Sequence, residues 1–198
     1  ACRSRLRIPV SAKIRLGWED DSGLLDLARA VERGGACWLT IHGRTKVQMY
    51  RGQADWEAIG RARAAVSIPV IANGDLFRPR DVLDCARVTG CTSFMLGRGA
   101  FRTPNLFRWT KGLDDRAWSF DACATLLQRF IARVFADPRF DRPERAALNR
   151  LKGWVRALGD RDPDFDAVFH RLKRAQTSEE AVAWLTNTPT ETILEAHA

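Results

Sequence analysis

The chain has 198 residues, of which 45% are hydrophobic and 28% charged, and its 32 Lys and Arg against 24 Asp and Glu residues give a formal net charge of +8. This composition is typical of a globular protein of one or two domains and excludes an intrinsically disordered chain. No run of 18 apolar residues occurs, so we expect no membrane-spanning helix. The positive charge favours an anionic partner such as nucleic acid, although a basic protein without such a partner would have the same charge.

Four segments in the first part of the chain each contain a short apolar run that stops at polar residues or glycine. Such runs predict buried strands, within residues 8–18, 36–45, 68–75 and 92–99. Amphipathic helical patterns follow the first three, at 24–35, 55–66 and 79–90. This βα alternation predicts a parallel sheet with right-handed crossovers.

The strand ends discriminate between two parallel architectures. A doubly wound sheet binds its ligand at one switch point, whereas a TIM barrel has functional groups at the carboxyl end of every strand. Here all four predicted strands end in polar candidates, namely Lys13 and Arg15, His42 and Arg44, Asn73 and Asp75, and Arg98. We therefore expect an α/β fold in which residues 1–112 form the C-terminal half of a TIM (β/α)8 barrel, because only four of eight strands are present.

The pattern changes after residue 112 to amphipathic helices, predicted at 119–136, 143–158, 164–175 and 178–186. Ser119 and Ser178 are predicted N-caps. Residues 113–198 are thus expected to form a second, all-helical domain. On helix 143–158, Arg145, Lys152 and Arg156 share one face, which is either an ordinary solvated surface or a stripe that contacts phosphates.

The five cysteines form neither a C-x-x-C pair nor a Cys/His metal pattern. Cys2, Cys37, Cys85, Cys91 and Cys123 therefore predict no metal site and fit a reduced, cytoplasmic protein. The first residue is Ala1, and a strand follows almost at once, which suggests a cut inside a longer protein.

The stretch Gly97-Arg98-Gly99 lies at a predicted strand-to-helix turn. Glycine lets a backbone approach a ligand closely, free N–H groups attract anions, and an arginine adds a charged contact. TIM barrels often bind phosphate with the loops after strands seven and eight. The turn therefore predicts a phosphate site, and the alternative is a tight turn with Arg98 in solvent. Asn73-Gly74 ends the preceding strand in a similar way.

Two further strand-end residues suggest a flavin. Lys13 lies between apolar neighbours, where its charge is costly without a partner, and a lysine can stabilise the anionic N1 and O2 region of a reduced flavin. His42 could hydrogen-bond the same ring. The alternatives are a surface lysine and a structural histidine.

Four motifs together resemble the tRNA-dihydrouridine synthases, which are FMN-dependent TIM-barrel flavoproteins with a C-terminal helical domain. The motifs are "AKIRLGW", "IHGRTKVQMYRGQADWEAIG", "IPVIANGD" and "GCTSFMLGRGAFRTPNLF". The stretch "RLKGWVRALG" further resembles the bacterial C subfamily, which modifies uridine 16 in the D-loop of tRNA.

The resemblance implies roles for individual residues. Lys13 and His42 would contact the flavin ring, Asn73, Gly74 and Asp75 would form part of the FMN site, and Gly97 with Arg98 would hold its phosphate. The residues that would contact tRNA are Tyr50, Lys152, Trp154 and Lys173. A family aromatic position is occupied by Ala157. The full-length protein would be a cytoplasmic monomer.

The family reaction uses NADPH to reduce FMN, which then gives hydride to C6 of a flipped uridine while a cysteine acid protonates C5. That cysteine follows an Asn-Gly pair, a context that none of the five cysteines here has. The chain is therefore expected to hold half of the FMN site, no catalytic acid, and no activity alone. Two alternatives remain, a different FMN-dependent barrel reductase acting on a small molecule and a non-catalytic tRNA-binding remnant.

Overall fold

The computed structural model describes residues 8–186, and the chain divides into two compact units, Ala1–Gly99 and Ala100–Ala198. Each unit has its own hydrophobic core, and the two cores share no residue. Cys2 lies outside the described residues. No helix within the described part of the chain is long and apolar enough to cross a membrane.

The first unit contains a four-stranded parallel sheet in the order β1-β2-β3-β4. Its strands are β1 (Ala12–Arg15), β2 (Leu39–His42), β3 (Val70–Asn73) and β4 (Ser93–Met95). Each lies inside one of the four predicted segments, so the prediction of a four-stranded parallel α/β arrangement is confirmed. The strands are shorter than those segments because the residues on either side form the loops that carry the polar groups.

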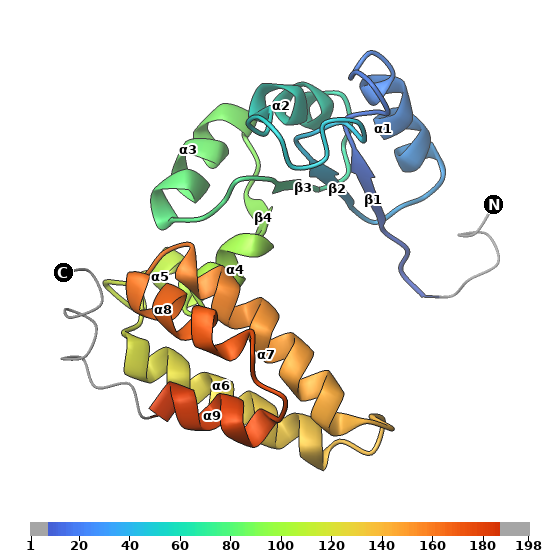
Figure 1. Ribbon diagram of the computed structural model, residues 1–198. Helices are drawn as coiled ribbons and strands as arrows, with labels where there is room; N and C mark the ends of the chain where they lie inside the picture. Colours follow the sequence, from blue (N-terminus) through green and yellow to red (C-terminus); the bar gives the residue numbers. More distant parts are fainter. Residues whose placement is uncertain (1–7, 187–198) are drawn as a thin grey trace. The chain divides into compact units, whose positions relative to one another are not determined.

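Three helices cover one face of this sheet (Figure 1). They are α1 (Leu24–Arg33), α2 (Trp56–Ala64) and α3 (Pro79–Thr89). Leu39 and Ile41 of β2 pack with Ile59 of α2 and Val82 of α3 in the core between the layers. Helices on one face only are typical of a barrel segment, since a doubly wound sheet has helices on both faces.

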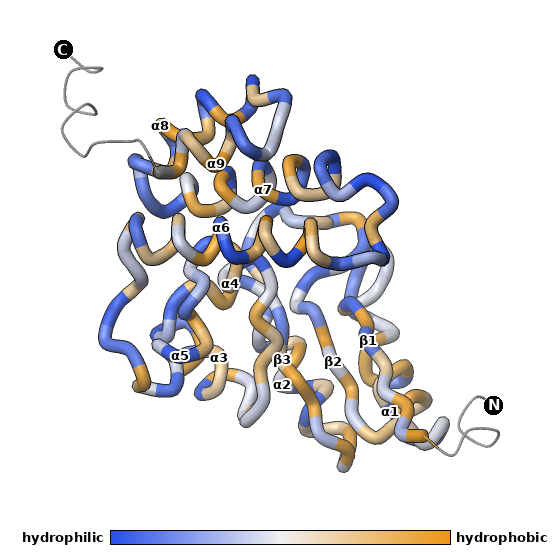
Figure 2. The backbone as a smooth tube through the Cα atoms, turned by 90° about the horizontal axis from the view of Figure 1, so that it is seen from below, coloured by the Kyte–Doolittle hydropathy of each residue, from blue (hydrophilic) through white to orange (hydrophobic). Residues whose placement is uncertain are grey.

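The opposite face of the sheet carries polar side chains. Thr40 and His42 alternate along β2 with the core residues Leu39 and Ile41, as the period of two in a strand requires. Figure 2 shows hydrophobic stretches along β1, β2 and β3. The sheet therefore presents its polar row away from the helices.

The second unit has helices as its regular elements within the described residues. A short helix, α4 (Arg98–Arg102), begins in the last residues of the first unit and is followed by α5 (Leu106–Thr110). The long helices are α6 (Phe120–Ala136), α7 (Pro143–Gly159), α8 (Pro163–Leu172) and α9 (Ser178–Thr186).

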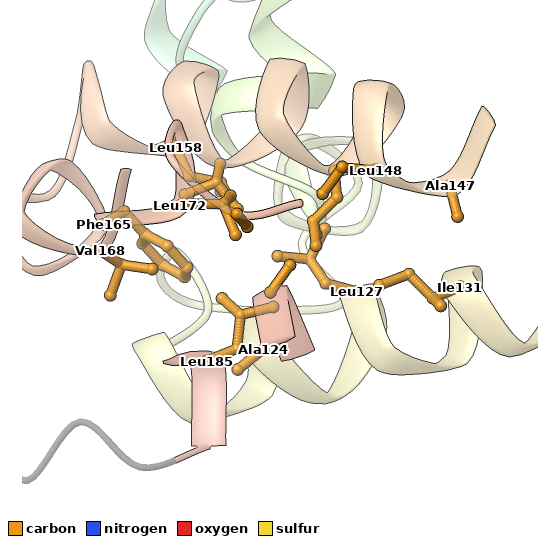
Figure 3. Close-up of a cluster of buried hydrophobic side chains, with 14 of the residues drawn as sticks. Ala124, Leu127, Ile131, Ala147, Leu148, Leu158, Phe165, Val168, Leu172 and Leu185 are labelled. Carbon is orange, nitrogen blue, oxygen red and sulfur yellow. The ribbon is translucent and has the colours of Figure 1, made fainter. Parts of the chain in front are cut away.

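The core of the second unit collects side chains from all four long helices (Figure 3). Leu127 of α6, Leu158 of α7, Phe165 of α8 and Leu185 of α9 are all almost completely buried there. The apolar face predicted for residues 143–158 is confirmed, because Leu148, Leu151, Val155 and Leu158 are all buried.

One of the two predicted helix caps is right and the other is wrong. Ser119 precedes α6, and its side chain accepts a hydrogen bond from the Ala122 N–H at 3.4 Å. Ser178 is instead the first residue of α9, and its hydroxyl donates to Glu144 Oε2 at 2.8 Å. The capping oxygen is that of Thr177, which accepts from the Glu180 N–H at 3.1 Å. Two adjacent hydroxyl residues left the choice open in the sequence.

Candidate functional site

Pairing of the strands aligns their carboxyl ends in one row. Arg15 pairs in register with His42, His42 with Asn73, and Asn73 with Met95. Lys13 lies two residues before Arg15 and therefore on the same face of β1. Residues far apart in the sequence thus meet at one edge of the sheet.

These strand ends line a pocket of about 220 Å³. All seven residues predicted to bind the cofactor line it, and so does Tyr50. The full lining is Lys13, Arg15, His42, Tyr50, Asn73, Gly74, Asp75, Leu76, Phe77, Met95, Gly97, Arg98 and Gly99.

The pocket is cationic. Lys13, Arg15 and Arg98 line it against a single carboxylate, that of Asp75. Partial burial, and then the neighbouring charge of Arg15, lower the pKa of Lys13. No hydrogen bond or ion pair links the Lys13 ammonium to another of the residues 8–186. The Lys13 residue is exposed, so water solvates its charge in part, and an anion in the pocket would supply the counter-charge that it lacks among the described residues.

His42 is a neutral ring at physiological pH. It is only 8% exposed, and burial, followed by the charges of Lys13, Arg15 and Arg44 and opposed by that of Asp75, lowers its pKa to about 4. Its Nδ1 is buried without a hydrogen-bond partner in the described part of the chain. Unpaired buried nitrogens are rare in complete structures, so this atom marks a site that a ligand or further residues would complete.

Gly74 brings the backbone of the β3 end close to its neighbours. Its φ is +127°, and a Cβ there would lie 2.8 Å from the Ala54 Cβ and 3.2 Å from His42 Nδ1. Its carbonyl accepts from Trp56 Nε1 at 3.0 Å. Only glycine fits this position without strain.

Asn73 connects two strands through its side chain, because its Nδ2 donates to the Met95 carbonyl at 2.7 Å. Gly97 behaves differently from Gly74. A Cβ at Gly97 would meet no atom within 4 Å, and its φ is not in the left-handed range. Gly97 therefore leaves open space beside the pocket rather than relieving a contact within the protein.

Asp75 lines the pocket, and donors from several segments surround its carboxylate. Its carboxylate accepts from Arg44 Nη2 at 2.7 and 3.0 Å, from the Ala54 N–H at 2.7 Å and from Arg98 Nη2 at 3.4 Å. The Asp75 backbone has a φ of 55°, which is uncommon for a residue other than glycine. The side chain of Asp75 is thus held mainly by protein groups.

Tyr50 forms part of the pocket rim. It is 59% exposed, and the guanidinium carbons of Arg98 and Arg15 lie 4.7 and 5.9 Å from its ring centre. Arg15 Nη1 also donates to the Thr45 and Met49 carbonyls at 3.1 Å each. Arg15 therefore fixes the loop that carries the exposed ring.

The other predicted tRNA contacts belong to the second unit. Lys152 Nζ donates to the Ala175 carbonyl at 2.9 Å and to the Lys173 carbonyl at 3.2 Å. Trp154 Nε1 donates to the Phe101 carbonyl at 3.1 Å, and its ring packs edge-on against Phe101 and Phe130. Lys152 and Trp154 thus have structural contacts of their own.

Lys173 is exposed, and its Nζ lies 3.2 Å from His170 Nδ1. The structure brings Lys152 and Lys173 together. The RNA contacts expected of Tyr50, Lys152, Trp154 and Lys173 remain predictions. Of the basic face predicted on α7, Arg145 and Arg156 are exposed and Lys152 is half-buried.

Three lining residues have no site role predicted from the sequence, which are Leu76, Phe77 and Met95. All three are apolar and carry no sequence signal for a site. Arg15 is predicted as a strand-end candidate and Gly99 as part of the Gly-Arg-Gly turn, and both line the pocket.

None of the four described cysteines lines this pocket. Burial raises the pKa of the Cys85 thiol to about 12 and also raises the pKa values of Cys91 and Cys123. Residues 8–186 contain no group of three or more His, Cys, Asp or Glu side chains that could hold a metal ion.

Comparison with known proteins identifies relatives along most of the chain. The tRNA-dihydrouridine(16) synthase of Haemophilus influenzae is 38% identical over 173 residues, which cover 87% of this chain and 54% of that relative. The proteins of the same name from Escherichia coli O157:H7 and Salmonella typhimurium are 43% and 42% identical, covering 84% and 87% of this chain and 51% and 54% of the relatives. The chain thus spans about half the length of these relatives.

The dihydrouridine synthase family pattern matches residues 1–188, which include the whole first unit, most of the second and every residue of the pocket. The family resemblance read from the four sequence motifs is therefore confirmed. This chain belongs to the dihydrouridine synthase (Dus) family.

Proposed function

We propose that this chain is the C-terminal part of an FMN-dependent tRNA-dihydrouridine synthase, which reduces uridine to 5,6-dihydrouridine in the D-loop of tRNA with NADPH as reductant. The observation that carries the proposal is the cationic pocket at the strand ends, which gathers Lys13, His42, Asn73-Gly74-Asp75 and Gly97-Arg98. Membership of the family and the names of the relatives support the reaction.

In this proposal residues 1–112 form the second half of a TIM barrel and residues 113–198 a helical tRNA-binding domain. The size of the pocket supports an incomplete site, because about 220 Å³ is below the roughly 300–1,000 Å³ of typical ligand pockets. Residues outside this chain would complete the pocket and supply the cysteine acid.

The pocket residues suit an anionic flavin nucleotide. Arg98 and the open backbone at Gly97 would hold the phosphate, and the ammonium of Lys13 would lie against the electron-rich edge of the ring. His42, which is neutral at pH 7, would hydrogen-bond the ring without adding charge. Bound flavin would supply the hydride-transfer chemistry that no amino-acid side chain provides.

The tRNA would contact Tyr50 at the pocket rim and Lys152, Trp154 and Lys173 in the second unit. Uridine 16 is the proposed target, because the matched relatives are named tRNA-dihydrouridine(16) synthases. Base chemistry on tRNA requires a flipped nucleotide, and the exposed ring of Tyr50 offers a stacking surface beside the pocket. The net charge of +8 also favours a polyanion.

The decisive experiment uses the longer polypeptide that this proposal requires. We expect it to convert uridine 16 of unmodified tRNA to dihydrouridine with FMN and NADPH, as read by sequencing of dihydrouridine sites. Lys13→Met and Arg98→Met should each reduce the rate by at least about tenfold, since each removes a charged contact. Modification of another uridine would overturn the assignment of uridine 16 as the target. Reduction of a small molecule without modification of tRNA would overturn the proposed tRNA-dihydrouridine synthase activity.

The 198-residue chain alone should be inactive and should bind FMN only weakly, because the first half of the site is absent from it. Titration followed by flavin fluorescence measures this affinity. A monomeric chain with micromolar affinity would contradict the fragment proposal while leaving the proposed reaction in place.

A further inference from the structure

Arg44 is a buried cation directly behind the pocket. Its side chain is 2% exposed, its Nε donates to the Arg51 carbonyl at 3.1 Å, and its Nη2 donates to the Gly52 carbonyl at 2.6 Å. Burying a charge is costly unless it is paired and hydrogen-bonded. Arg44 is paired with Asp75, whose carboxylate lies 2.7 Å from its Nη2, while its Nη1 has no hydrogen-bond partner among the described residues.

The Asp75 carboxylate connects three segments of the chain. One oxygen accepts from Arg44 and from Arg98 at the start of α4, and the other accepts from Arg44 and from the Ala54 N–H before α2. An ionised carboxylate has about four acceptor sites. These four contacts leave the Asp75 side chain little capacity to bind a ligand directly.

The Arg44–Asp75 pair contacts two groups at the pocket opening, which are the Arg98 side chain and the backbone of residues 51 and 52. Arg98 is the cation at the Gly-Arg-Gly turn, and its Nη2 reaches Asp75 at 3.4 Å. Arg44 also ties the carbonyls of residues 51 and 52, which directly follow Tyr50. The Arg44–Asp75 pair therefore holds two of the groups that surround the pocket opening, while Arg44 itself is not part of the lining.

We propose that Arg44 and Asp75 are positioning residues, which fix the Arg98 guanidinium and the loop at residues 51–54 for binding of an anionic ligand. The identity of that ligand as a flavin phosphate rests on the proposed function. The side chain of Asp75, which also lines the pocket, acts on the ligand through Arg98.

The first test measures order in the Arg98 side chain of the 198-residue chain by nitrogen-15 relaxation of its Nε–H group. We expect Asp75→Asn to lower the order of Arg98 and to speed hydrogen exchange at the Ala54 amide by at least about tenfold, because a charged acceptor is lost. Asp84→Asn is the matched control, since Asp84 pairs with Arg80 and Arg87 on the surface of α3. Unchanged order at Arg98 in Asp75→Asn would overturn the proposal.

Asp75→Asn leaves Arg44 buried without a counter-charge, so it could unfold the first unit. The double variant Arg44→Gln with Asp75→Asn removes both charges and leaves no unpaired ion. It should fold and show the same loss of order at Arg98. A folded double variant with a rigid Arg98 would refute the positioning role.

The second test compares FMN with riboflavin, which lacks the phosphate. Titrated into the longer polypeptide that the proposed function requires, with and without the same two substitutions, FMN should bind about tenfold more weakly to the double variant than to the wild type, whereas riboflavin affinity should stay within about twofold. Equal losses for both ligands would indicate a general structural role and contradict the proposal. If wild type binds neither flavin, the proposed function loses support, and the order of Arg98 still decides the positioning role.

Discussion

At the scale of single residues, Gly74 is expected to be the most sensitive glycine of the pocket. Gly74→Ala would place a Cβ 2.8 Å from that of Ala54 at a φ of +127°. We expect it to lower the free energy of unfolding of the first unit by about 1–3 kcal/mol, measured by urea denaturation. Gly23→Ala, where a Cβ meets nothing within 4 Å, is the control, and equal effects of the two changes would contradict this explanation.

At Gly97 we expect an added methyl group to affect ligand binding and not stability. Because a Cβ there meets no protein atom, Gly97→Ala should leave the unfolding midpoint unchanged. If a phosphate approaches this backbone, the added methyl group should weaken FMN binding severalfold and leave riboflavin binding unaffected. Isothermal titration of both ligands into the longer polypeptide that the proposed function requires checks this, and an unchanged FMN affinity would remove Gly97 from the proposed phosphate contact.

The pKa of His42 has a consequence for stability. In the folded chain it is lowered from 6.5 to about 4, so the unfolded chain binds more protons between these values and stability falls as pH drops from 6.5 towards 4. His42→Asn should flatten this dependence in urea denaturation at pH 7 and pH 4.5. His170→Asn, at an exposed position of α8, should retain it. An equally steep loss of stability in His42→Asn would count against the burial of a neutral ring.

The sequence predicted which polar residues end the strands, because parallel strands bring their carboxyl ends to one edge. It could not predict that the Asp75 carboxylate faces Arg44 and the Ala54 N–H. Those contacts join residues 21 and 31 positions apart and depend on the loop at residues 44–54, which has no periodic pattern. The separation of direct ligand contacts from supporting contacts is therefore visible only in three dimensions.

At the scale of elements, Phe165 shows how α8 is held in the second unit. It is completely buried, and its ring centre lies 4.5 Å from that of Phe120 in α6. Phe165→Ala should cost about 3–5 kcal/mol of unfolding free energy, followed by far-ultraviolet circular dichroism in urea. Phe135→Ala on the same chain is the control, because Phe135 is 45% exposed. A cost below about 1 kcal/mol for Phe165→Ala would mean that α8 is not anchored there.

Long amphipathic helices were predictable and short ones were not. The predicted helices at 119–136 and 143–158 agree with α6 and α7 to within one residue at each end, since several turns of apolar periodicity and a starting Ser or Pro define them. Helices α4 and α5 have five residues each, which is too short for periodicity to detect. Helix α4 begins at Arg98, inside the Gly-Arg-Gly stretch, and α5 follows it.

At the scale of the whole molecule, the two separate cores predict separable folding. The core of the second unit takes no residue from the first, so residues 100–198 expressed alone should unfold cooperatively and keep their helical circular dichroism signal. Residues 1–99 alone should associate or aggregate, because β1 and β4 each have one unpaired edge in the described sheet. Light scattering and thermal unfolding measure both outcomes. A non-cooperative melt of residues 100–198 would show that its core depends on the first unit.

The position of Tyr50 has a practical consequence. Tyr50 is the single tyrosine of the chain, and its ring lies 4.7 Å from the guanidinium carbon of Arg98 at the pocket rim. Biosynthetic incorporation of 3-fluorotyrosine would therefore give one fluorine-19 resonance for the entire protein, located beside the pocket. That resonance would serve as a built-in reporter, able to register flavin, RNA or inorganic phosphate arriving at this rim without any engineered label.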